Sequence, residues 1–169
     1  MKGHCRLLLI FLLPLFSCTD TRQQKETNHF SQDFEQLEGW AKVKITNEIS
    51  AHSGKFCNRI DEEVPYGATF TIANPKIKMI KVSAWCNFSN SDCKGSLCIN
   101  ITDKAEQSKQ WENTILEEKV QKSKSWTKVY LYATLKPEAQ SQDNKISIFA
   151  MNNGKSKFYI DDVEIEMAE

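Results

Sequence analysis

The stretch "KFYIDDVEIEM", residues 157–167, places two adjacent aspartates in the middle of a strand-like segment. The apolar residues are Phe158 and Ile160 before the pair and Val163, Ile165 and Met167 after it. Their numbers are even before the pair and odd after it, although side chains of a regular strand alternate strictly between two faces. One extra residue reverses the faces in this way and forms a β-bulge. The stretch therefore predicts a strand that is bulged at Asp161–Asp162.

Most of the remaining chain alternates apolar and polar residues with the same period of two. Seven such segments are residues 42–49, 55–60, 68–72, 80–88, 96–102, 128–135 and 145–151. Turn-forming residues separate them, as is typical of half-buried antiparallel strands. Residues 111–121 fit either a helical turn or an irregular strand. Eight or so short strands predict an all-β fold, a two-sheet antiparallel β-sandwich.

Length and charge narrow the class of protein. The chain has 169 residues, a length that favours one domain. It has 22 basic and 22 acidic side chains. Because there is no basic surplus, nucleic acid is not expected as a partner.

The N-terminus has the features of an export signal. Lys2 and Arg6 precede the apolar run 7–16, which is too short to span a bilayer as a helix. The end of this run, "LFSC" with Leu15 and Ser17, resembles a bacterial lipobox with Cys18 as the lipidated residue. The alternative is an ordinary secretory signal cleaved nearby. We predict a signal peptide over 1–17 and a lipoprotein held on a membrane only by its lipid.

The polar residues that follow lack any periodicity. We predict a tether over 18–29 and the folded domain over 30–169. Loss of the signal removes two basic residues and leaves a net charge of about −2.

Four cysteines remain beyond Cys5 and Cys18, and an exported compartment permits disulfides. They are Cys57, Cys86, Cys93 and Cys98. Because Cys93 lies in a loop between two strands, we expect it to pair with Cys86 or Cys98. The alternative is that these are buried thiols.

Five motifs, in this order, together carry a resemblance to a known fold. They are "DFEQLEGW" (33–40), "AHSGKFC" (51–57), "IKVSAWCNF" (80–88), "SWTKVYLYATL" (125–135) and "FYIDDVEIEM" (158–167). Together they resemble the galactose-binding-domain-like jelly roll, which many carbohydrate-binding modules of glycoside hydrolases share. The resemblance covers about residues 30–167, and a fold alone does not determine function.

The resemblance implies a structural calcium ion where the first strand, the "SGK" turn and the last strand meet. Carried over to this chain, its ligands are Glu35, a backbone carbonyl near Lys55, and Asp161, with Asp33 or Asp162 assisting. Calcium takes six to eight oxygen ligands, so waters would complete the set. The alternative is a solvated bulge in which Asp side chains cap nearby backbone amides.

The sequence does not predict catalysis. Glu164 and Glu166 share a strand face and resemble part of the Glu-x-Asp-x-x-Glu strand of jelly-roll glycosidases, but the middle acid differs and the match runs into the C-terminus. His29 and His52 lie in no metal-ligand spacing. No GxSxG, GxGxxG or P-loop motif is present.

The outward positions of the alternating strands predict a ligand-binding surface. If the strands over 80–88, 96–102 and 145–151 are neighbours, one outer face carries Trp85, Asn87, Asn100, Phe149 and Met151. Rings and amides together suit sugars, whose C–H faces pack on aromatic rings. Tyr66 and Trp111, taken as loop residues, offer an edge site instead. Tyr130 and Tyr132 are expected in the opposite sheet.

Some of these aromatic residues have a structural interpretation as well. Trp40 and Trp126 match packing positions of the family. Trp85 and Phe149 would form a minor core if loops covered that face.

Two classes of function stay open at this point. The first is a non-catalytic, glycan-binding lipoprotein of the bacterial cell envelope, whose partner is a polysaccharide or oligosaccharide. The second is a structural or adhesion module that binds an envelope or host protein.

Overall fold

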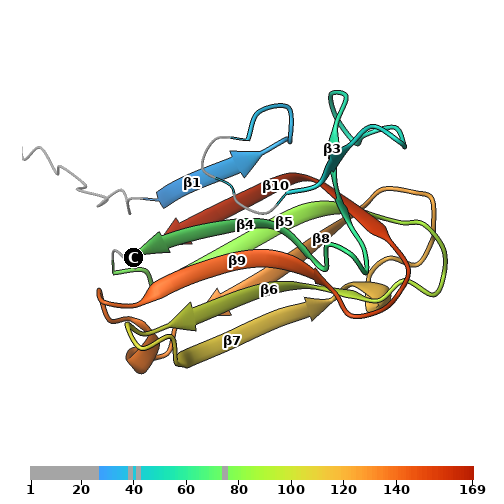
Figure 1. Ribbon diagram of the computed structural model, residues 1–169. Helices are drawn as coiled ribbons and strands as arrows, with labels where there is room; N and C mark the ends of the chain where they lie inside the picture. Colours follow the sequence, from blue (N-terminus) through green and yellow to red (C-terminus); the bar gives the residue numbers. More distant parts are fainter. Residues whose placement is uncertain (1–26, 38–39, 41–42, 74–75) are drawn as a thin grey trace, which may run out of the picture.

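The computed structural model describes residues 27–37, 40, 43–73 and 76–169. The predicted signal peptide, the lipidation site Cys18 and the tether up to residue 26 lie outside this part of the chain. The described residues form ten strands in two antiparallel sheets that pack face to face (Figure 1). No helix among them is long and apolar enough to span a membrane. The predicted two-sheet β-sandwich is therefore confirmed.

The larger sheet, here sheet A, contains both ends of the described chain. Its strands are β1 (Thr27–Gln32), β2 (Ile45–Thr46), β3 (Cys57–Ile60), β5 (Met79–Phe88), β8 (Thr127–Thr134) and β10 (Phe158–Ala168). The order is β2-β3-β10-β5-β8, and β1 also pairs with β10. Strand β1 begins before the predicted domain start at Phe30, because residues 27–29 pair with 166–168.

The smaller sheet, sheet B, has four strands in the order β4-β9-β6-β7. Their bounds are β4 (Tyr66–Ala73), β6 (Gly95–Thr102), β7 (Ser108–Ile115) and β9 (Lys145–Asn152). Single 3-10 turns occupy Leu116–Glu118 and Pro137–Ala139. Residues 111–121, ambiguous in the sequence, thus complete strand β7 and then form a short turn.

Strand β10 holds sheet A together and contains the predicted bulge. Its register against β5 shifts between Asp161 and Glu164, and Asp162 has a left-handed backbone with φ of 43°. Before the bulge β10 pairs with β3, and after it with β1. Because the bulge reverses the faces, both halves of β10 direct apolar residues into the core.

The core lies between the sheets and is built from the apolar positions that the alternation predicts. The innermost side chains include Val82, Ala84, Ile99, Ile148 and Ile165, all fully buried. Trp40 packs on Phe70 with ring centroids 5.4 Å apart, which confirms its packing role.

The expected disulfide is absent from this part of the chain. Cys57, Cys86, Cys93 and Cys98 are all buried free thiols. Cys86 faces the core from β5, whereas the Cys93 thiol donates to the carbonyl oxygen of Lys157, 3.0 Å away. The expected pairing of Cys93 was therefore wrong, and the alternative of buried thiols is correct.

Candidate functional site

The outer surface of sheet B brings together four of the six residues predicted to bind ligand. Cross-strand pairing places Tyr66 on β4 beside Met151 on β9, and Trp111 on β7 beside Asn100 on β6. Phe149 on β9 lies between them, opposite Thr69 and Cys98. We call Tyr66, Phe149, Trp111, Asn100 and Asn113 the aromatic face.

The three rings of this face form a row across the strands. The centroid of Phe149 lies 5.9 Å from that of Tyr66 and 5.9 Å from that of Trp111, with interplanar angles of 67° and 66°. Tyr66 is 48% exposed and Trp111 is 44% exposed, while Phe149 is partly buried between them. The central ring thus supports two outer rings that are open to solvent.

Neutral polar groups surround these rings. Asn100 Oδ1 accepts a hydrogen bond from the Ser108 hydroxyl at 2.8 Å, which leaves its Nδ2 group without a protein acceptor among the described residues. Asn113 is exposed beside Cys98. The residues that pair across β4, β9, β6 and β7 at the positions of Tyr66, Phe149 and Trp111 include no charged side chain. Aromatic rings bordered by amides and hydroxyls can pack on sugar rings and fix their orientation by hydrogen bonds.

The other two predicted residues lie elsewhere. Trp85 and Asn87 belong to β5 in sheet A, so the sandwich separates them from Phe149 and Asn100. The expectation of one shared face was wrong because alternation shows which side of a strand a residue faces but not which strand is its neighbour. Tyr66 and Trp111 are strand residues rather than loop residues.

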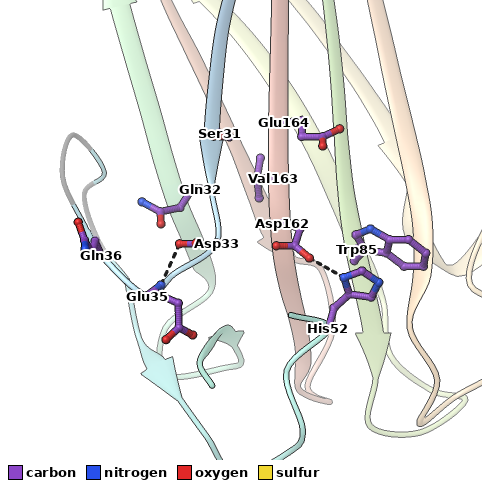
Figure 2. Close-up of a pocket in the computed structure, with 10 residues that line it drawn as sticks. All are labelled: Ser31, Gln32, Asp33, Glu35, Gln36, His52, Trp85, Asp162, Val163 and Glu164. Carbon is purple, nitrogen blue, oxygen red and sulfur yellow. Dashed lines mark hydrogen bonds and ion pairs between the residues drawn. The ribbon is translucent and has the colours of Figure 1, made fainter. Parts of the chain in front are cut away.

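Trp85 lines a cavity of about 700 Å³ on the outer side of sheet A (Figure 2). The ring of His52 stacks on Trp85 with centroids 3.8 Å apart and planes 15° apart. His52 Nδ1 lies 2.5 Å from Asp162 Oδ2, and Figure 2 shows this contact directing the imidazole against the indole. One ring face of Trp85 is therefore covered by His52, which favours its packing interpretation.

Glu35 and Asp161 approach the same loop from opposite ends of the chain. Asp161 Oδ2 accepts the backbone amides of His52 at 2.8 Å and Ser53 at 3.2 Å. Glu35 Oε1 accepts the amides of Lys55 at 2.6 Å and Phe56 at 2.8 Å. The predicted junction of the two termini is confirmed, and its contacts are those of amide capping.

A calcium ion does not fit these contacts as they stand. A cation needs free oxygens, whereas Asp161 Oδ1 also accepts the amide of Asp162, at 2.9 Å, so both of its oxygens face N–H donors. The described residues contain no group of three or more His, Cys, Asp or Glu that could hold a metal ion. The resemblance implies calcium at Glu35, Lys55 and Asp161, whereas the contacts seen here favour the alternative of amide capping.

Burial sets the protonation of Asp161. The side chain is completely buried, and this raises the pKa of its carboxyl to about 6, although the amides of Ser53 and His52 oppose the rise. Gly54, between the two capped amide pairs, has φ of 59°, and a Cβ there would lie 2.5 Å from Glu35 Oε1. The loop therefore approaches Glu35 as closely as glycine permits.

The paired glutamates of the last strand form ion pairs. Glu164 Oε2 lies 3.1 Å from Lys128 Nζ, and Glu166 Oε1 lies 2.7 Å from Lys81 Nζ. Lys128 and the Ser83 hydroxyl hold the pKa of Glu164 below its usual value. A general acid needs a raised pKa, so this arrangement does not favour sugar hydrolysis.

No protein-family model matches the chain, and no curated protein matches it by sequence. Its fold is similar to those of solved carbohydrate-binding modules. The CBM22-1 xylan-binding domain of Paenibacillus barcinonensis Xyn10C has a TM-score of 0.61 and 14% identity, over 86% of this chain and 97% of that chain. The CBM22-2 xylan-binding domain of the same enzyme gives 0.54 and 16%, over 83% and 99%.

A third similar structure includes an oligosaccharide. It contains the CBM22-1 and GH10 modules of Clostridium thermocellum Xyn10B complexed with xylohexaose, with a TM-score of 0.56 and 16% identity, over 82% of this chain and 28% of that chain. At such identities the likeness establishes the jelly-roll fold, in agreement with the resemblance seen in the sequence.

Proposed function

We propose that this chain is a non-catalytic glycan-binding lipoprotein whose β-sandwich binds polysaccharide on the aromatic face. The observation that carries the proposal is the row Tyr66–Phe149–Trp111, which crosses sheet B and exposes two of its three rings. Exposed aromatic groups among neutral hydrogen-bonding groups are typical of surfaces that bind sugars. Likeness to solved xylan-binding domains supports the same class of ligand.

The proposal of a binding protein without catalysis is supported by the state of the carboxylates. Glu164 and Glu166 are paired with lysines, and Asp161 and Glu35 accept backbone amides. None of these four acids lies on the aromatic face, so none is placed to act on a glycan bound there.

We further propose that lipid on Cys18 holds the domain in the bacterial cell envelope. The support is the basic N-terminus, the apolar run and the lipobox-like "LFSC". Mass spectrometry of the membrane fraction tests it: we expect a diacylglyceryl adduct on Cys18, and a Cys18→Ser variant in the soluble fraction. A Cys18→Ser protein that stays with the membrane would contradict the anchor.

Affinity electrophoresis of the purified protein tests the glycan proposal. The gels would contain xylan, mannan, mixed-linkage glucan or no polysaccharide. We expect retardation by at least one polysaccharide, and at least about tenfold weaker binding for Trp111→Ala, because a solvent-exposed ring that becomes covered by ligand is a principal contact.

The matched control is Tyr132→Ala, which removes a ring that is 64% exposed on the outer side of sheet A. It should leave the retardation unchanged. Equal loss in both variants, or no retardation in any gel while envelope proteins are captured, would contradict glycan binding at this face.

A further inference from the structure

A second cavity lies on the outer side of sheet A, at the end where β5 finishes and β8 and β10 begin. Its volume is about 540 Å³, within the range of small-molecule sites. The lining includes Asn87, Lys124, Trp126, Lys157, Tyr159 and Glu48. We call it the loop-end cavity, and sheet B with its aromatic face lies on the other side of the sandwich.

Asn87 gives this cavity an unused hydrogen-bonding group. It lies on β5, next to the last residue of that strand, and is only 8% exposed. Its side-chain amide has no hydrogen bond to any of the residues that the structure describes. Neither polar atom of this amide is among the buried side-chain atoms that lack a partner, so the amide is open to the cavity but has no protein partner among the described residues. A ligand in the cavity would supply one.

The charges around the cavity leave one cation in excess. Glu48 lies 3.1 Å from Lys157 Nζ and 3.2 Å from the guanidinium of Arg59, and its Oε1 accepts the Tyr159 hydroxyl at 2.5 Å. Glu48 is therefore fully engaged and charged. Lys124, in contrast, has no ion-pair partner in the described part of the chain.

The backbone places Lys124 at the rim of the cavity. Its amide donates to the Phe88 carbonyl at 2.7 Å, which ties this residue to the end of β5. Its φ of 58° lies in the left-handed region that most side chains avoid. This hydrogen bond holds the backbone of Lys124 beside the end of β5, and the residue lines the cavity together with Asn87.

Trp126 supplies an apolar wall. Its Nε1–H donates to the Ser50 carbonyl at 3.1 Å, which fixes the indole in place. The cavity thus combines an indole ring, a free amide and an unpaired ammonium group. An apolar ring face, hydroxyl groups and a negative charge in one small molecule would satisfy all three.

We propose that the loop-end cavity binds a carboxylate-bearing sugar, a uronic acid. The carboxylate lies against Lys124, a hydroxyl group bonds to the Asn87 amide, and the C–H face of the ring packs on Trp126. This site is separate from the aromatic face and does not depend on it. A free uronic acid would therefore occupy this site without engaging the aromatic face.

Isothermal titration of the purified protein with glucuronate tests the proposal. Glucose serves as the uncharged analogue, and acetate supplies a carboxylate without the sugar ring. We expect saturable binding of glucuronate, and at least about tenfold weaker binding of glucose and of acetate. Lys124→Gln and Asn87→Ala should each weaken glucuronate about tenfold, and added salt should weaken it because Lys124 is exposed.

Two controls separate this site from other causes. Lys122→Gln removes a neighbouring exposed charge that does not line the cavity, and Trp111→Ala removes the exposed ring of the aromatic face. Both should bind glucuronate as the unaltered protein does, whether or not the aromatic face binds polysaccharide. Lys124→Gln, at an exposed position, keeps the experiment interpretable if Asn87→Ala fails to fold.

Three results with the cavity variants and ligands would overturn the inference, and a fourth comes from the control Trp111→Ala. They are glucuronate heats that do not saturate, equal affinity for glucose and glucuronate, and unchanged affinity in Lys124→Gln. Loss of glucuronate binding in Trp111→Ala would move the ligand to the aromatic face and overturn it as well.

Discussion

The neighbouring residues Asp161 and Asp162 make different contacts because the backbone changes direction between them. Asp161 is buried and accepts three backbone amides, whereas Asp162, in the left-handed conformation, contacts His52 and accepts the Ser53 hydroxyl at 2.7 Å. The bulge could be predicted because alternation is a local property of the strand. The amides of His52 and Ser53 could not be predicted as donors to Asp161, since they belong to a loop more than a hundred residues away.

Replacement of Asp161 by Ala should strongly destabilise the fold. The change leaves the amides of His52, Ser53 and Asp162 without their acceptor, and we expect a loss of about 2–3 kcal/mol in the free energy of unfolding. Urea unfolding followed by tryptophan fluorescence measures it. Asp92→Ala, in an exposed turn, should change little, and equal midpoints for the two variants would contradict the role of Asp161.

Glu48 should contribute stability that disappears in acid. The Tyr159 hydroxyl, then Lys157 and Arg59, hold the pKa of Glu48 below its usual 4.5 although burial opposes them. A folded-state pKa below the unfolded value means that the contribution is complete above pH 4.5. It is then lost as the pH falls through the lower, folded-state pKa.

Unfolding midpoints against pH test this. Glu48→Gln should be less stable than the unaltered protein at pH 7, and the difference should vanish well below pH 4.5. Glu62→Gln, which changes an exposed acid outside this network, should follow the unaltered protein throughout. A Glu48→Gln difference that persists or grows in acid would contradict the assignment.

At the scale of elements, strand existence could be predicted better than strand pairing. Strands β6 and β7 are joined by a short loop and are neighbours, as a hairpin should be. Strand β10 instead pairs with β1, β3 and β5, none of which is next to it in sequence. Strands β5 and β6 follow one another in sequence but belong to different sheets, so Trp85 and Phe149 do not share a face. The row of Tyr66, Phe149 and Trp111 was not predicted because Tyr66 and Trp111 were taken as loop residues.

The junction of the two termini, where Glu35 and Asp161 accept amides of one loop, can be tested at this scale. With Asp161 and Glu35 occupied by amides of the same loop, we expect the melting temperature to be the same in EDTA and in millimolar calcium. Differential scanning calorimetry measures both. A midpoint raised by calcium and lowered by EDTA would establish the metal that the resemblance implies, and Asp161→Ala should then abolish that response.

At the scale of the whole molecule, the sandwich presents two unlike outer surfaces. The centre of sheet B is uncharged and aromatic, whereas sheet A carries the ion pairs Lys81–Glu166 and Lys128–Glu164. One apolar core lies between them and includes residues from both sheets. The amount of buried apolar surface, rather than any covalent link, therefore has to account for the stability of the described domain.

The absence of a covalent link in the described domain can be tested on its four buried cysteines. Burial raises the pKa of the Cys57 and Cys98 thiols to about 12 and also raises that of Cys86, so few reactive thiolates form at neutral pH. In a variant with Ser at positions 5 and 18, we expect no reaction with a thiol reagent in the native state and four thiols after unfolding. Dithiothreitol should leave the melting temperature unchanged. Fewer than four thiols after unfolding, together with a midpoint lowered by dithiothreitol, would instead show that a disulfide contributes to the fold.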